Sequence, residues 1–227
     1  MHSEIKGIIL DYGEVLCVRP NEEQVAQMAD VFGISQAQFA TLYEKNRNAY
    51  DRGDLTPEVY WSSFADELGI GLHSDRISHL RAWDVEMWSD LNPVMIEWLV
   101  CIHRGGIRTA VLSNMHADMV ARLRGGVDWI KHVDVVVLSQ EVRLAKPEAE
   151  IYAYCLDRLG TTPHETLFID DREVNVNAGQ ALGIKAVRFE SVSQLRSELE
   201  KLGFPIVPSE SVADLARRFP IPSTGRD

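Results

Sequence analysis

Several short apolar runs of this chain end in polar side chains that together could transfer a phosphoryl group. They are Asp11 after "GIIL", Ser113 and Asn114 after "TAVL", the pair Asp170 and Asp171 after "TLFI", and Lys146 one loop beyond "VVVL". A carboxylate can attack phosphorus, while a hydroxyl and a lysine can bind phosphoryl oxygens. Three carboxylates would raise one another's pKa values unless a cation lay among them, and hard oxygen ligands favour Mg²⁺.

The pattern of apolar residues predicts the elements that would bring these side chains together. Short apolar runs, typical of strands buried on both faces, cover 7–10, 108–112, 133–138, 166–169 and 185–189. Helical patterns lie between them, at 93–103, 117–123 and 148–159, and after Asp170-Asp171 up to Leu182-Gly183, and another begins near Ser191. Strands that alternate with helices predict a doubly wound parallel sheet of the α/β class. Such sheets bind ligands beyond the carboxyl ends of their strands.

A block without a convincing strand interrupts this alternation. Between residues 20 and 88 the pattern is helical, with a capping box at Ser35, a proline start at Thr56-Pro57 and a stop at Gly69. We therefore predict a core domain of residues 1–19 and 89–227 with an inserted helical-bundle cap of residues 20–88. Five aromatic side chains recur at helical spacing in this block and are predicted to form its core: Tyr60, Trp61, Phe64, Trp83 and Trp88.

The composition narrows the function classes. A net charge of -11 leaves no overall basic field, so we expect no nucleic acid partner. The three cysteines are far apart and form no CxxC pair, which favours a reducing compartment. No run approaches the roughly 20 apolar residues that span a bilayer, and the N-terminus lacks the pattern of a leader. These features predict a soluble, cytoplasmic protein, monomeric or homodimeric. The proline-containing tail is expected to hold one short helix near 212–218.

Four motifs in order carry a family resemblance. The segments "LDYGEVL", "LSN", "KPEAEIY" and "FIDDREVNVNAGQALG" resemble the motifs of the haloacid dehalogenase superfamily, in the subgroup with a helical cap after the first strand. The resemblance spans roughly residues 5 to 190. It implies that Asp11 is the nucleophile, that Ser113, Asn114 and Lys146 bind the phosphoryl group, and that Asp170 and Asp171 hold Mg²⁺, with Asn175 supporting their turn. It also implies that cap residues select the substrate, for which Arg47 and Arg52 are candidates.

The chain departs from the family at Gly13. Most phosphatases of the superfamily carry a second aspartate there, which transfers a proton while its backbone carbonyl binds the metal. Gly13 keeps the carbonyl but loses the proton transfer, which is typically worth about 10²- to 10⁴-fold in rate. Glu14 and His116 are the candidate substitutes by their positions. A similar Asp-x-Gly opening in sugar-phosphate phosphatases of the capped subgroup indicates that the glycine is compatible with activity.

Three functions remain open on the sequence. The first is a Mg²⁺-dependent phosphomonoester hydrolase acting on a small phosphorylated metabolite, such as a sugar phosphate. The second is a 2-haloacid dehalogenase, which needs no metal and usually lacks the paired aspartates of the last motif. The third is a binding or regulatory protein of the same fold, which only Gly13 supports. The acidic pair favours the first.

Overall fold

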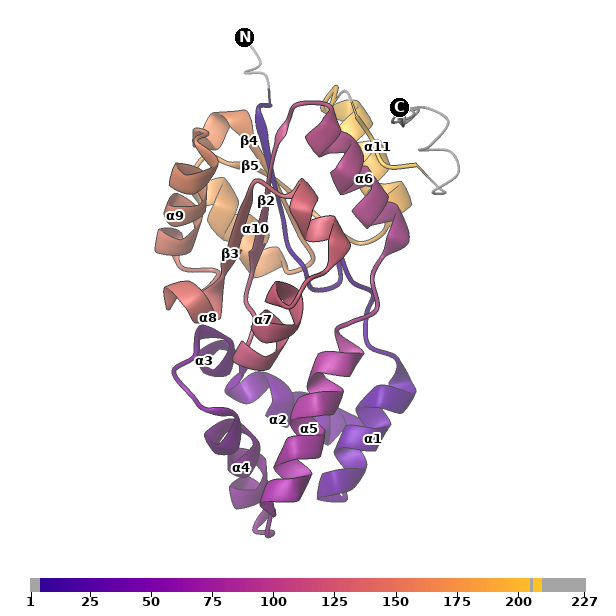
Figure 1. Cartoon of the computed structure of the whole chain (residues 1–227), viewed down its shortest axis with the longest axis vertical. Helices are drawn as coiled ribbons and strands as arrows, with labels where there is room; N and C mark the ends of the chain where they lie inside the picture. The colour runs from indigo at the N-terminus through magenta and orange to yellow at the C-terminus, as the bar shows by residue number, and fades with distance from the viewer. Residues whose placement is uncertain (1–4, 205, 210–227) are drawn as a thin grey trace, which may run out of the picture.

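The computed structural model describes residues 5–204 and 206–209, and its centre is a five-stranded sheet (Figure 1). The strands are β1 (Gly7–Leu10), β2 (Arg108–Ser113), β3 (Val135–Leu138), β4 (Thr166–Asp170) and β5 (Lys185–Arg188). All four neighbouring pairs are parallel, and the order is β3-β2-β1-β4-β5. The chain thus builds outward from β1 to β3 and then returns to place β4 beside β1. The predicted doubly wound α/β sheet is confirmed, and its order reverses between β1 and β4.

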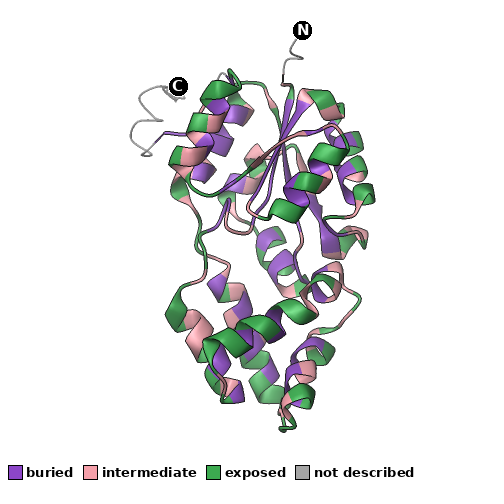
Figure 2. Ribbon diagram, turned by 180° about the vertical axis from the view of Figure 1, so that it is seen from behind, coloured by how far each residue is buried: buried purple, intermediate pink, exposed green. Residues whose placement is uncertain are grey.

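Helices cover both faces of this sheet, which is why its central strands are mostly apolar (Figure 2). One face packs through Ile8 and Leu10 against apolar side chains of α6 (Pro93–Arg104), α7 (Ala117–Arg124) and α11 (Val192–Lys201). The other packs through Ile9 and Phe168 against α9 (Ala149–Leu159) and α10 (Glu173–Ala181). The polar residues of the candidate site stand at the carboxyl ends of the strands, where Ser113 ends β2 and Asp170 ends β4.

Five further helices lie beyond the carboxyl ends of the strands (Figure 1). They are α1 (Glu22–Phe32), α2 (Gln36–Lys45), α3 (Arg47–Arg52), α4 (Pro57–Leu68) and α5 (Ser74–Met87). Their apolar side chains form a cluster of their own around Tyr60, Trp61 and Phe64, with Trp83 and Trp88 packed against it. The predicted aromatic core is therefore present. Two connecting segments join this bundle to the sheet. They are linked to each other by an isolated antiparallel bridge between Cys17 and Leu91.

The structure differs from the predicted elements at short segments. The third strand begins at Val135 instead of 133, because the chain before it forms a 3-10 helix, η1 (Asp128–His132), whose C-cap is Val133. The predicted loop before Lys146 contains the helix α8 (Ser139–Val142), and a second 3-10 helix, η2 (Pro163–Glu165), precedes β4. The predicted tail helix at 212–218 lies outside the described residues. Within the described part of the chain, no helix is both long and apolar enough to cross a membrane.

Candidate active site

A buried lysine joins two aspartates at the point where the strand order reverses. Asp11 directly follows β1, and Asp170 ends the neighbouring strand β4. Lys146 Nζ lies 2.9 Å from Asp11 Oδ1 and 2.6 Å from Asp170 Oδ2. All three side chains are at least nine-tenths buried. The sequence predicted Lys146 as a fixed charge beside a bound anion, and the structure places it as a bridge between the two carboxylates.

Asp170 is the most fully bonded of these carboxylates. Its Oδ1 accepts hydrogen bonds from the Arg172 backbone N–H and from Asn175 Nδ2, both at 2.9 Å, while its Oδ2 accepts the bond from Lys146. Asn175 therefore supports the turn after β4, as the family resemblance predicted. The hydrogen bonds hold Asp170 in one orientation, from which it positions the Lys146 ammonium.

Asp171 completes a group of three carboxylates that could hold a metal ion. Asp11, Asp170 and Asp171 each offer an oxygen, and these oxygens lie within 4.8 Å of one another. In the part of the chain that the structure describes, the Asp171 carboxylate makes no hydrogen bond or ion pair. The three carboxylates together form a set of hard oxygen donors, and one of them has no other partner among the described residues. Such a set fits Mg²⁺. The donors present thus fit the predicted ion.

Burial and mutual repulsion change the proton affinity of these groups. Burial, with a contribution from Asp170, raises the pKa of Asp11 to about 6 against the lowering effect of Lys146. Burial, Asp11 and Asp170 together raise the pKa of Asp171 to about 7. Burial alone would lower the pKa of Lys146, but its two aspartate partners raise it above its usual value. The lysine therefore stays charged, while a cation is needed to keep all the carboxylates ionised near neutral pH.

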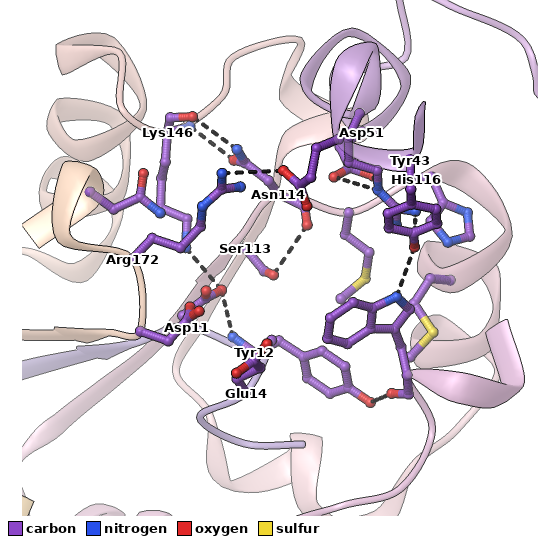
Figure 3. Close-up of a pocket in the computed structure, with 18 residues that line it drawn as sticks. Asp11, Tyr12, Glu14, Tyr43, Asp51, Ser113, Asn114, His116, Lys146 and Arg172 are labelled. Carbon is purple, nitrogen blue, oxygen red and sulfur yellow. Dashed lines mark hydrogen bonds and ion pairs between the residues drawn. The ribbon is translucent and has the colours of Figure 1, made fainter. Parts of the chain in front are cut away.

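The serine that ends β2 and the asparagine that follows it flank this charged centre (Figure 3). Ser113 is buried and lines the pocket, and its hydroxyl lowers the pKa of Asp11 by hydrogen bonding. The Asn114 amide bonds the backbone of Lys146 twice, as a donor to the carbonyl at 2.9 Å and as an acceptor from the N–H at 2.8 Å. Asn114 therefore holds the Lys146 loop, a positioning role that the sequence did not predict.

Gly13 leaves a space between the nucleophile candidate and an aromatic ring. A Cβ atom at this residue would lie 3.9 Å from Asp11 Oδ2 and 3.9 Å from Trp88 Cζ3, which is ordinary contact. Trp88 is held there by two hydrogen bonds, since its Nε1 donates to the Tyr43 hydroxyl and its carbonyl accepts from the Tyr12 hydroxyl. Trp88, predicted as part of the aromatic core, thus also lines the pocket.

The two candidate proton carriers both lie against other groups. Glu14 lines the pocket, but its carboxylate accepts a hydrogen bond from Arg19 Nε at 2.8 Å. His116 faces the helical bundle, where its ring stacks on Tyr50 at 5.0 Å and its Nε2 lies 3.3 Å from Asp84 Oδ2. Figure 3 shows His116 beside Tyr43, across the pocket from Asp11. The geometry therefore does not support His116 as the substitute for the missing aspartate.

Of the two arginines named as candidates for substrate selection, only Arg47 lines the pocket. It is buried, it lines the pocket, and it pairs with Asp51 at 2.9 Å and with Asp84 at 3.1 Å. Arg52 does not line the pocket, and it pairs instead with Asp54 and Glu148. Sequence reasoning missed the acidic partners of Arg47, although the i,i+4 spacing to Asp51 on one helix was a usable signal.

A doubly wound sheet carries an aspartate, a lysine and an aspartate pair at its switch point, which is where α/β enzymes of this kind bind their ligands. The model of the haloacid dehalogenase-like hydrolase family matches residues 5–183, and the chain belongs to this family. The family resemblance predicted from the sequence is therefore confirmed.

Curated relatives include both phosphatases and dehalogenases. Acyl-CoA dehydrogenase family member 10 of Mus musculus is 34% identical over 119 residues, which are 50% of this chain and 11% of that protein. Phosphoglycolate phosphatase of Salmonella typhi is 28% identical over 132 residues, 58% of this chain and 52% of that protein. (S)-2-haloacid dehalogenase 1 of Pseudomonas sp. (strain CBS-3) is 26% identical over 200 residues, 84% and 86% of the two chains. The chain thus spans about half or less of the first two relatives.

Solved structures show the same fold. A HAD family enzyme of Bacteroides thetaiotaomicron, in complex with magnesium and inorganic phosphate, matches with a TM-score of 0.66 and 22% identity, over 82% of this chain and 94% of that chain. L-2-haloacid dehalogenase of Xanthobacter autotrophicus matches with a TM-score of 0.62 and 20% identity, over 94% and 88% of the chains.

Proposed function

We propose that the chain is a Mg²⁺-dependent phosphomonoester hydrolase that works through an aspartyl-phosphate on Asp11. One observation carries the proposal: the oxygens of Asp11, Asp170 and Asp171 converge within 4.8 Å beside the charged Lys146. The Salmonella phosphatase and the Bacteroides enzyme with magnesium and phosphate support it. The substrate class is a small phosphorylated metabolite, with sugar phosphates first. A screen of such esters with Mg²⁺ tests the proposal. If the protein hydrolyses none of them, the proposal is overturned.

The side chains have separate roles in this reaction. A carboxylate oxygen of Asp11 attacks phosphorus and the P–O bond to the leaving group breaks, which gives the aspartyl-phosphate. Water then attacks phosphorus, which releases inorganic phosphate and restores the Asp11 carboxylate. Lys146 and Ser113 bind phosphoryl oxygens, and Asn114 holds the Lys146 loop. Mg²⁺, held by Asp11, Asp171 and the Gly13 carbonyl with Asp170 beside them, would neutralise phosphoryl charge when bound. In this scheme residues 20–88 form a cap that covers the leaving group.

Because residue 13 has no acidic side chain, the rate of hydrolysis should depend strongly on the acidity of the leaving alcohol. Without a proton donor, negative charge builds up on the leaving oxygen, so esters of acidic alcohols should react faster. We expect kcat/KM for p-nitrophenyl phosphate to exceed that for a simple alkyl phosphate by about 10²-fold or more. Gly13→Asp should narrow this gap, because the backbone there is not left-handed and a Cβ has room. Gly13→Asn has a side chain of the same shape but donates no acidic proton, so it should leave the kcat/KM gap between the two esters unchanged. If both variants narrowed this gap equally, the loss of a proton donor at residue 13 would not explain it.

Mg²⁺ should stabilise the protein more at about pH 8 than at about pH 5. The folded pKa values of Asp11 and Asp171, about 6 and about 7, lie above the ordinary 3.8. The folded protein therefore holds extra protons at acid pH, and its stability without metal falls as pH rises through these values. Metal binding must displace those protons, so it strengthens as they leave. Urea unfolding with and without saturating Mg²⁺ at both pH values measures the difference. A metal effect that is equal, or larger at pH 5, would contradict the site.

The similarity to haloacid dehalogenases over most of both chains favours one second candidate, displacement of halide from carbon by Asp11. Such a reaction needs no metal, whereas the structure brings a third, unbonded carboxylate to the site. Assays of phosphate esters and 2-haloacids with and without EDTA separate the two. Phosphatase activity that EDTA removes supports the first proposal, and metal-independent halide release supports the second.

A further inference from the structure

The part of the pocket that faces the helical bundle has no spare positive charge. The pocket is lined by five carboxylates and three cations: Asp11, Glu14, Glu44, Asp51 and Asp171, with Arg47, Lys146 and Arg172. Each of these cations is already paired. Lys146 pairs with Asp11 and Asp170, as described above, and Arg172 pairs with Glu44 at 3.3 Å.

Arg47 is the buried cation on the bundle side of the pocket, and carboxylates outnumber it there. Its Nε donates to Asp51 and its Nη1 to Asp84, and the Tyr43 hydroxyl accepts from Nη1 while it donates to Asp84 at 2.5 Å. Both carboxylates are buried and belong to the helical bundle. One guanidinium between two buried carboxylates leaves the group with a net negative charge, so an added anion would meet repulsion that the low dielectric strengthens.

His116 does not restore the balance. It is buried against Tyr50 and Asp84, and no hydrogen bond reaches either ring nitrogen within the described residues. Burial lowers the pKa of His116, so the ring is neutral at neutral pH. The apolar groups beside it, Met115 and Met119, offer no charge either.

We propose that the leaving-group side of the pocket selects against a second anionic group, so the substrates are phosphate monoesters whose alcohol part is neutral or positively charged. Figure 3 shows the arrangement, with Asp51 and Tyr43 on the side of the pocket opposite Asp11. The inference rests on the proposed phosphatase function. It separates this chain from proteins named for carboxylate-bearing substrates, such as the phosphoglycolate phosphatase and haloacid dehalogenase to which it is similar.

Three esters of nearly equal size test the proposal: phosphoglycolate, 2-hydroxyethyl phosphate and 2-aminoethyl phosphate, which carry a carboxylate, a hydroxyl and an ammonium. We expect kcat/KM with Mg²⁺ to be at least about tenfold lower for phosphoglycolate than for the other two, since its carboxylate would be repelled by the carboxylates around Arg47. Binding to the Asp11→Asn variant, measured by calorimetry with Mg²⁺, should follow the same order. Equal or better binding and turnover of phosphoglycolate would overturn the inference.

The variant Asp51→Asn isolates the charge balance. It removes one buried carboxylate while its backbone carbonyl still accepts the Ser139 hydroxyl at 2.6 Å, so the phosphoglycolate penalty should shrink at least about fivefold. Asp54→Asn, a half-exposed carboxylate outside the pocket, is the matched control and should leave the penalty unchanged. An undiminished penalty in Asp51→Asn would overturn the charge argument. If the protein hydrolyses none of the three esters, the phosphatase proposal fails, but the order in which the esters bind to Asp11→Asn still tests the selection against anions. If none of the esters binds, both proposals are overturned.

Discussion

Asp11→Asn is expected to lower kcat on every phosphate ester by about 10⁴-fold or more, because an amide cannot act as the nucleophile. The substitution keeps the shape of the side chain, and Lys146 keeps its 2.6 Å pair with Asp170. The measurement is steady-state phosphate release with Mg²⁺ by the purified variant. Asp128→Asn is the matched control, since Asp128 is fully exposed in η1, and it should keep normal turnover.

The same variant carries a second, opposite expectation for stability. Burial raises the pKa of Asp11, which means that the ionised carboxylate is held at a cost in the folded protein. Its neutral isostere should therefore unfold at an equal or higher urea concentration. Loss of both activity and stability would indicate that the variant fails to fold normally. Full activity in a stable variant would show that another residue does the chemistry.

Lys146→Met is expected to produce the largest loss of stability of any single change at the site. Removing the lysine leaves Asp11 and Asp170 as buried carboxylates without their cation, and breaking such a pair costs about 3–5 kcal/mol. Phosphate release should fall to background as well, because the lysine is proposed to bind the phosphoryl group. Urea unfolding near pH 7 without metal measures the stability difference.

Two further variants check the cause of that loss. Lys131→Met changes an exposed lysine, 65% exposed in its side chain, and should cost less than about 0.5 kcal/mol. The double variant with Asp11→Asn should recover part of the loss, because only one unpaired carboxylate then remains. If Lys146→Met were as stable as the unaltered protein, the ion-paired centre would not exist in solution.

The sequence was sufficient for the sheet and for the residues at its carboxyl edge. A strand buried on both faces is apolar up to its last residue, so the polar residues after "GIIL", "TAVL" and "TLFI" marked the strand ends directly. Parallel strands bring such ends to one edge, and the convergence of Asp11, Asp170 and Asp171 was predicted for that reason. The helical nature of the block between residues 20 and 88 followed from its apolar periodicity in the same way.

What the sequence could not predict depends on contacts between segments far apart in the chain. Arg47 gave no sign of its partner Asp84, which is 37 residues away on another helix. His116 was a candidate by its place after the serine loop, yet packing against Tyr50 turns it toward the bundle. The amide of Asn114 is used by the backbone of Lys146, a pairing that no local pattern encodes. Short helices such as α3 and α8 were missed because they are too brief for periodicity to show.

The most direct test of the account is a crystal structure of the chain with Mg²⁺ and beryllofluoride, which mimics a phosphoryl group on a carboxylate. The account predicts beryllium bonded to an oxygen of Asp11, its fluorides near Lys146 and Ser113, and Mg²⁺ held by Asp11 and Asp171. Beryllofluoride bound elsewhere, or carboxylates that bind no metal while Lys146 still bridges Asp11 and Asp170, would contradict it.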